Sequence, residues 1–199
     1  MTKSRMEAFS DGVIAVIITI MVLEMRAPLG SDVSALKPLI PVFLSYVMSF
    51  VFLGIYWNNH HHMLQAVHSV NGRILWANLN LLFWLSLTPF VTNWMGETHF
   101  AQWPVMVYGV VLILSGIAYY ILSRTLVAHH GPDSALAAAL GSDFKGKISI
   151  LIYAGAIGFA FLAPGISCAL YAAVALMWLI PDRRFERVLL QGTGGKEER

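Results

Sequence analysis

The chain has 199 residues, of which 57% are hydrophobic and only 12% are charged, and its mean hydropathy is +0.67. Soluble domains carry about 25% charged residues, so this composition indicates a membrane protein. The net charge of +2 is too small and too dispersed to indicate nucleic-acid binding, and one cysteine, Cys168, excludes an intrachain disulfide or a cysteine metal site.

Six apolar segments are candidates for membrane-spanning helices, each of which needs about 20 mostly apolar residues. They lie at about 8–25, 38–60, 74–95, 103–124, 147–163 and 166–181. Pro89 predicts a kink or an irregular stretch inside the third segment. Pro164-Gly165 predicts a tight turn that divides one long apolar run into the last two segments. The sequence therefore predicts an all-α integral membrane protein with a six-span unit at 1–182 and a tail at 183–199.

The positive charges predict how these spans are oriented. If the N-terminus is inside, eleven Lys and Arg residues lie on the inner side and only Arg26 and Lys37 lie on the outer side. The inner ones are Lys3, Arg5, Arg73, Arg124, Lys145, Lys147, Arg183, Arg184, Arg187, Lys196 and Arg199. Positively charged residues gather on the cytoplasmic side of membrane proteins. We therefore expect a multi-pass protein of the cell membrane with both termini in the cytoplasm.

The first span carries an aliphatic stripe. Val16, Ile20 and Leu23 follow one another at i, i+4 and i+7, and Thr19 lies beside them. Lipid-facing and pore-facing aliphatic residues look alike in sequence, so periodicity alone favours ordinary packing for this stripe. Asp11 lies on the opposite side of the helix.

The first and second spans carry the family resemblance. The first contains the pattern Arg5-x-x-x-Phe9-Ser10-Asp11-Gly12-Val13-x-Ala15-x-x-x-Thr19. This pattern resembles the first-helix signature of the potassium channel family called transmembrane protein 175. Trp57, His60 and His61 are similar to that family's second-helix pattern, and the six-span layout extends the resemblance over most of the chain.

The resemblance implies a potassium channel built as a homotetramer, with one six-helix unit per subunit and the first helices around the pore. It places the hydrophobic constriction at Val16, with Ile20 and Leu23 further outward, and it places an ion-contacting hydroxyl at Thr19. Val16 is smaller than the isoleucine or leucine usual at its position. Since no TVGYG-like filter loop is present, we expect only moderate selectivity for K⁺ over Na⁺. The partners implied are other copies of the chain and the bilayer; K⁺ is the permeant ion and no cofactor is expected.

The remaining polar residues of the first two spans have competing interpretations. Asp11 either supports the helix packing or forms a cytoplasmic-side cation site, and we favour packing because it faces away from the stripe. We expect Arg5, Ser10, Asp11, Trp57 and His60 to form a polar network that holds the first helix in place. Three consecutive histidines at 60–62 cannot all face one ion from a helix, so no metal site is expected there.

Two other function classes are weaker than a channel. A proton-coupled or other secondary cation transporter is the alternative, motivated by Asp11 and the histidines. Such transporters usually carry ionisable residues at mid-bilayer, which the central spans lack. An enzyme is not expected, because no HExxH, GxSxG or paired-carboxylate motif occurs.

Overall fold

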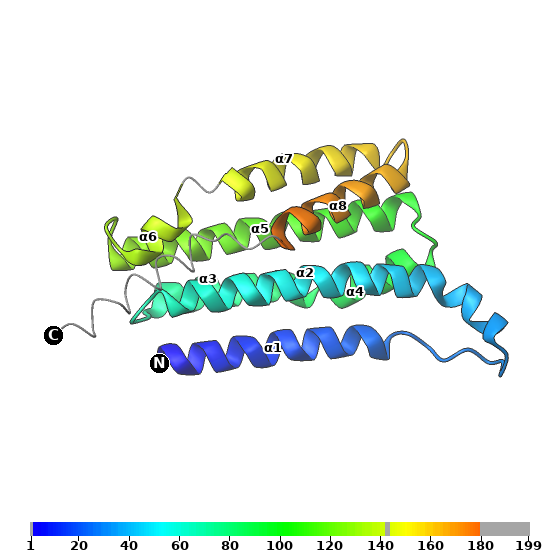
Figure 1. Cartoon of the computed structure of the whole chain (residues 1–199), viewed down its shortest axis with the longest axis horizontal. Coiled ribbons are helices and arrows are strands. Elements are labelled where there is room, and N and C mark those ends of the chain that lie inside the picture. The colour runs from blue at the N-terminus through cyan, green and yellow to red at the C-terminus, as the bar shows by residue number, and fades with distance from the viewer. Residues whose placement is uncertain (1, 142–143, 180–199) are drawn as a thin grey trace.

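The computed structural model describes residues 2–141 and 144–179, and within these ranges all regular structure is helical (Figure 1). The elements are α1 (Lys3–Leu23), the 3₁₀ helix η1 (Val33–Leu39), α2 (Ile40–Gln65), α3 (Gly72–Ser86), α4 (Thr88–Glu97), α5 (Gln102–His130), α6 (Ala135–Leu140), α7 (Phe144–Phe159) and α8 (Pro164–Leu179). The all-α fold expected from the sequence is confirmed. The tail expected at 183–199 lies outside the described residues.

Four helical segments in the described ranges are long and apolar enough to cross a membrane. They are Lys3–Leu23, Val33–Gln65, Gly72–Glu97 and Gln102–His130. The last two expected spans correspond to α7 and α8, which have 16 residues each. At 1.5 Å per residue each is about 24 Å long, somewhat less than a hydrocarbon core of about 30 Å. That these two helices cross the bilayer stays a prediction.

Proline and glycine set two helix boundaries that bear on the expected spans. The third span is divided, because α3 ends at Ser86 and α4 starts at Thr88 with Pro89 in its first turn. Proline lacks the N–H that a helix interior needs, but it is well suited to a first turn. α5 continues six residues beyond the expected end at 124 and stops at Gly131, whose φ of 94° favours glycine.

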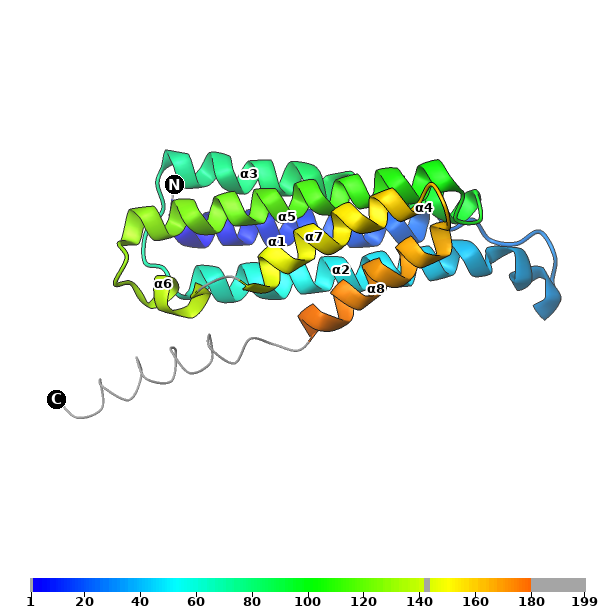
Figure 2. The ribbon, with the colours of Figure 1, turned by 90° about the horizontal axis from the view of Figure 1, so that it is seen from above.

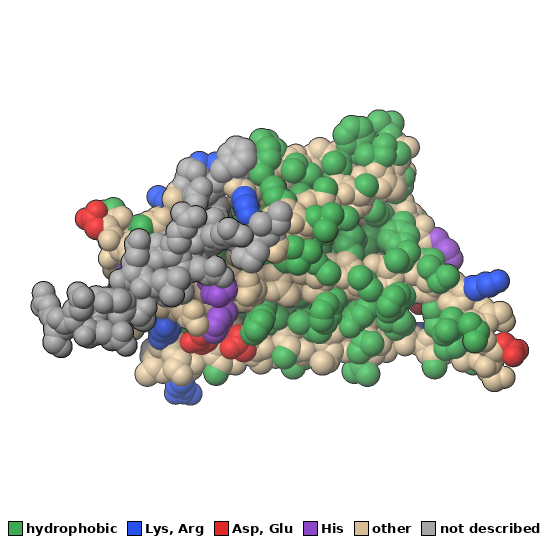
Figure 3. Space-filling model, viewed as in Figure 1, with side chains coloured by type: hydrophobic (Ala, Val, Ile, Leu, Met, Phe, Trp, Pro, Cys, Tyr) green, Lys and Arg blue, Asp and Glu red, His purple; other side chains and the backbone are tan. Residues whose placement is uncertain are grey.

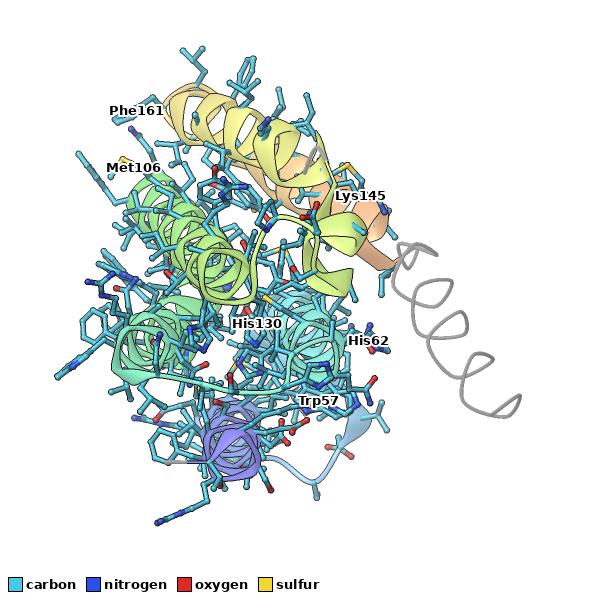
Figure 4. The ribbon with its side chains drawn as sticks, turned by 90° about the vertical axis from the view of Figure 1, so that its left-hand side faces the viewer. Trp57, His62, Met106, His130, Lys145 and Phe161 are labelled. Carbon is cyan, nitrogen blue, oxygen red and sulfur yellow. The ribbon has the colours of Figure 1, made fainter. Side chains whose placement is uncertain are left out.

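The helices form a layered bundle with α1 and the α7–α8 pair on opposite sides (Figures 1 and 4). We call the end at which α1 begins the inner end, after the predicted orientation, and the opposite end the outer end. Seen from above, η1 and the chain before it extend past the outer end of the bundle (Figure 2). One buried cluster joins α1, α2, α3 and α5, and a second joins α2, α4, α5, α7 and α8. The bundle therefore holds α1 by one face only.

Candidate functional site

The two faces of α1 have different surroundings. Its buried face consists of Met6, Ser10, Ile14, Ile17 and Met21, which recur every three or four residues. The opposite face contains the aliphatic stripe, where Val16 is 55% exposed, Ile20 39% and Leu23 78%. Thr19 is exposed on the same face. The structure thus brings the four expected pore residues together on the face of α1 that the bundle leaves open.

The hydroxyl of Thr19 has a defined orientation. Its Oγ1 donates a hydrogen bond of 2.9 Å to the carbonyl oxygen of Val16, one turn earlier. A hydroxyl has one hydrogen to donate and two lone pairs to accept with. Because its hydrogen is engaged by the helix, the oxygen presents its lone pairs outward, where they can contact a cation.

A groove of about 1140 Å³ runs beside this open face, between α1 and α4. Val16 and Ile20 line it from α1, and Phe90 lines it from α4. Two carboxylates, Glu24 and Glu97, lie at the outer ends of the two helices that form the groove. The groove therefore combines aliphatic walls with negative charge at its outer end.

The buried face of α1 is held by a chain of directed hydrogen bonds. Ser10 Oγ donates to the Met6 carbonyl at 2.8 Å, so it accepts the 2.9 Å hydrogen bond from Asn78 Nδ2. This fixes the Asn78 amide with Oδ1 toward His60 Nε2 at 2.8 Å, and His60 must then carry its proton on Nε2. Ser10, Asn78 and His60 are each at most 1% exposed. The chain of bonds therefore links α1, α3 and α2 inside the bundle.

A second set of contacts lies nearer to the surface, where Trp57 faces α1 (Figure 4). Trp57 Nε1 donates to Asp11 Oδ1 at 3.1 Å. The Trp57 ring stacks on His61, with the centroids 6.0 Å apart, and His61 Nδ1 lies 3.4 Å from Glu7 Oε1. Asp11 thus serves as a hydrogen-bond acceptor between helices in this arrangement.

The expected polar network is only partly assembled by these contacts. Ser10 is joined to His60, and Asp11 to Trp57, but the exposed side chain of Arg5 makes no hydrogen bond or ion pair with the described residues. Asn78, Glu7 and His61 were not expected as members. Asn78 could have been predicted as a member, because it lies in an apolar run without charged residues and a buried amide needs hydrogen-bond partners.

The histidine run offers no metal site in the described part of the chain. No group of three or more His, Cys, Asp or Glu side chains there is placed to hold a metal ion. His60 and His61 point to different partners, Asn78 and Glu7. His60 and His61 therefore belong to the packing between α1, α2 and α3.

Comparison with known proteins adds to this geometry. A family model described as endosomal/lysosomal potassium channel TMEM175 matches residues 5–89. A potassium channel of Chryseobacterium sp. (strain P1-3) is 56% identical over 189 residues, which cover 95% of this chain and 98% of that protein. The mouse endosomal/lysosomal proton channel TMEM175 is 27% identical over 147 residues, covering 65% of this chain and 29% of that protein. These relatives are channels by name, and none of them is an enzyme.

The fold is also shared with a solved structure. The crystal structure of a lysosomal potassium-selective channel TMEM175 homolog from Chamaesiphon minutus matches with a TM-score of 0.77 at 24% identity, covering 90% of this chain and 97% of that chain. The residues matched by the family model contain all of α1, α2 and α3 from Arg5 onward. Both faces of α1 described above therefore lie within the matched region.

Proposed function

The chain belongs to the TMEM175 family of channels, and from this premise we propose that it is a potassium-permeable cation channel formed by four copies around one pathway. The observation that carries the proposal is the two-sided character of α1. One face is anchored in the bundle by Ser10 and its partners, while the opposite face leaves Val16, Ile20 and Leu23 open. An aliphatic stripe left open in one chain is suited to face an axis shared by several copies.

The proposed pathway is gated by rings of aliphatic side chains. Four copies of Val16, Ile20 and Leu23 form three successive narrow rings. An apolar neck excludes water and therefore ions, and a small dilation restores the water. Thr19 lies between Val16 and Ile20 along the helix, and its outward lone pairs replace part of the hydration shell of K⁺. One hydroxyl ring replaces few of the ion's water ligands, so selectivity over Na⁺ is moderate.

The membrane setting follows from the same family and the apolar helices: this is a multi-pass membrane protein. We extend this to a location in the cell membrane, with the inner end of the bundle in the cytoplasm. The excess of Lys and Arg on that side supports the orientation. K⁺ is the transported ion in this proposal, and no bound cofactor takes part.

The experiment is a recording from the purified protein in planar bilayers, with K⁺ on one side and Na⁺ on the other. We expect single-channel currents whose reversal potential lies toward that of K⁺. A reversal potential that follows an imposed pH gradient would instead indicate a proton pathway, as the name of the mouse relative describes. Saturable flux without resolvable currents would indicate a transporter. Either of these two results contradicts the proposal.

Substitutions at the narrow rings test the assigned position of the pathway. Val16→Ala widens its ring, so the open-channel conductance is expected to rise, whereas Val16→Phe is expected to abolish it. Val110→Ala is the matched control, because Val110 is also partly exposed but lies on α5. Equal conductance for Val16→Ala and the wild type would mean that Val16 does not line the pathway.

A further inference from the structure

A second cavity lies away from α1, among α2, α5, α7 and α8. Its volume is about 230 Å³, and its walls include Tyr56, Gly116, Lys147, Tyr153 and Trp178. Lys147 belongs to the first turns of α7 and Trp178 to the last turn of α8, which places the cavity toward the inner end. The proposed ion pathway uses none of these residues.

Three tyrosine hydroxyls in this wall have no hydrogen-bond partner among the described residues, and one of them belongs to Tyr120, an exposed side chain. Neither Tyr56 nor Tyr153 makes a hydrogen bond with any described residue, although Tyr153 is only 5% exposed. Two other polar groups of the same wall are paired: Tyr119 OH donates to the Asn59 carbonyl at 3.4 Å, and Trp178 Nε1 donates to Ser149 Oγ at 2.9 Å. A polar group without a partner at membrane depth is costly. The hydroxyls of Tyr56 and Tyr153 therefore favour an occupant of the cavity that can accept a hydrogen bond.

Positive charge lies beside the cavity. Lys147 lines it, and Lys145 Nζ lies 5.9 Å from the ring centroid of Trp178. Figure 4 shows Lys145 at the inner end beside α7 and α8, on the far side of the bundle from α1. No Asp or Glu occurs among the described residues that line the cavity. The surroundings favour an occupant with a negative charge near the inner surface and an acceptor deeper in.

We propose that this cavity is a binding site for an anionic phospholipid of the cytoplasmic leaflet. The phosphate lies near Lys147, an ester carbonyl accepts a hydrogen bond from a tyrosine hydroxyl, and the upper part of one acyl chain fills the aromatic space. At about 230 Å³ the cavity is smaller than the roughly 300–1,000 Å³ of sites that enclose a drug-sized ligand. The second acyl chain therefore stays in the bilayer. Basic pockets between helices on the cytoplasmic side commonly hold anionic headgroups.

Native mass spectrometry of the purified full-length chain in neutral detergent tests this site. Phosphatidylglycerol and phosphatidylcholine with identical acyl chains are titrated separately, and the lipids retained per chain are counted. We expect one phosphatidylglycerol to be retained per chain, with an affinity about fivefold or more above that of phosphatidylcholine, as one lysine near a membrane surface provides. Equal retention of the two lipids would overturn the proposal. Retention of neither lipid, which is expected if only water fills the cavity, would also overturn it.

Variants separate the headgroup contact from the cavity. Lys147→Gln is expected to remove the preference for phosphatidylglycerol, whereas Lys37→Gln, in η1 at the outer end, is expected to keep it. Gly116→Leu fills the cavity, because a Cβ there meets only Tyr56 OH at 3.8 Å and larger atoms extend into the space. It is expected to abolish retention.

Gly155→Leu is the matched control, on an exposed position of α7 with nothing within 4 Å of the added Cβ. If Lys147→Gln and Gly116→Leu both retain phosphatidylglycerol over phosphatidylcholine as strongly as the wild type, the proposal is overturned. If Gly116→Leu does not fold, the lipid preferences of Lys147→Gln and Lys37→Gln test the proposal without it.

Discussion

Among single residues, Asn78 fixes the position of the first helix. Its Oδ1 accepts a hydrogen bond from the Nε2–H of His60, and its Nδ2 donates one to Ser10 Oγ, with all three side chains buried. Removal of one partner from a buried hydrogen-bonded group leaves the other polar groups unsatisfied, which costs about 1–3 kcal/mol per group. The amide of Asn78 therefore contributes to stability through groups on two other helices.

Asn78→Ala is expected to lower the free energy of unfolding in detergent micelles by about 1–3 kcal/mol. Asn80→Ala is the matched control on the same helix, because its side chain makes no hydrogen bond with the described residues and is only partly buried. That variant is expected to stay within about 0.5 kcal/mol of the wild type. Equal unfolding free energies for the two variants would mean that the buried network contributes nothing.

Thr19 is the residue on which the proposed selectivity depends. Thr19→Val keeps the shape of the side chain and removes its oxygen, so the K⁺/Na⁺ permeability ratio from reversal potentials is expected to fall toward one. Thr19→Ser keeps the hydroxyl and is expected to keep most of the ratio. Thr125→Val is the control, because Thr125 makes the same type of bond to its own helix but lies near the inner end of α5. An unchanged ratio in Thr19→Val would exclude the hydroxyl from ion contact.

Among the helices, the pairing of α5 with α8 depends on Gly109. A Cβ at this position would overlap the ring and hydroxyl of Tyr171, which is fully buried and donates to the Val105 carbonyl at 3.1 Å. Tyr171 is therefore held where it is and has no room to move away. Overpacking of this kind costs about 1–3 kcal/mol, more than the roughly 1 kcal/mol that alanine gains over glycine in a helix.

Gly109→Ala is therefore expected to destabilise the protein, which is checked by the melting temperature in detergent. Gly158→Ala, on α7 with nothing within 4 Å of the added Cβ, is expected to raise the melting temperature or leave it unchanged. A higher melting temperature for Gly109→Ala would show that α5 and α8 are further apart than described.

The helices differ in how far the sequence could predict them. The apolar runs at 8–25 and 38–60 overlap most of α1 and α2, because hydropathy reports directly on membrane helices, but both helices extend five residues further at the inner end. The break at Leu87 follows from Pro89, but the extension of α5 to His130 was missed, since a helix can continue past the membrane through polar residues until Gly131 ends it. Helix existence was thus easier to predict than helix ends.

The candidate site was predictable where it depends on one helix. Val16, Ile20 and Leu23 share a face through helical spacing alone, and that face is exposed. The network on the other face joins residues far apart in the chain, such as Ser10 and Asn78, and no local pattern specifies such a pair. Arg5 was expected in the same network, but its exposed side chain makes no hydrogen bond or ion pair with the described residues.

On the scale of the whole molecule, the charged side chains of the described residues lie toward the two ends of the bundle. Figure 3 shows hydrophobic side chains over the middle and charged side chains toward both ends, as a bilayer requires. The proposed orientation is tested by labelling intact cells with a membrane-impermeant maleimide in a Cys168→Ala background. Ser31→Cys is expected to react in intact cells, and Pro132→Cys only after permeabilisation. The reverse pattern would invert the orientation and contradict the positive-inside assignment.

The proposed function requires the open face of α1 to line the ion pathway. The most direct measurement is inhibition of single-channel current by a charged methanethiosulfonate reagent in a Cys168→Ala background. Leu23→Cys is compared with Leu151→Cys, since Leu151 is 68% exposed but lies on α7, across the bundle from α1. We predict that the reagent blocks current through Leu23→Cys and leaves Leu151→Cys unchanged. Unblocked current through Leu23→Cys, or equal inhibition of both variants, would contradict the claim.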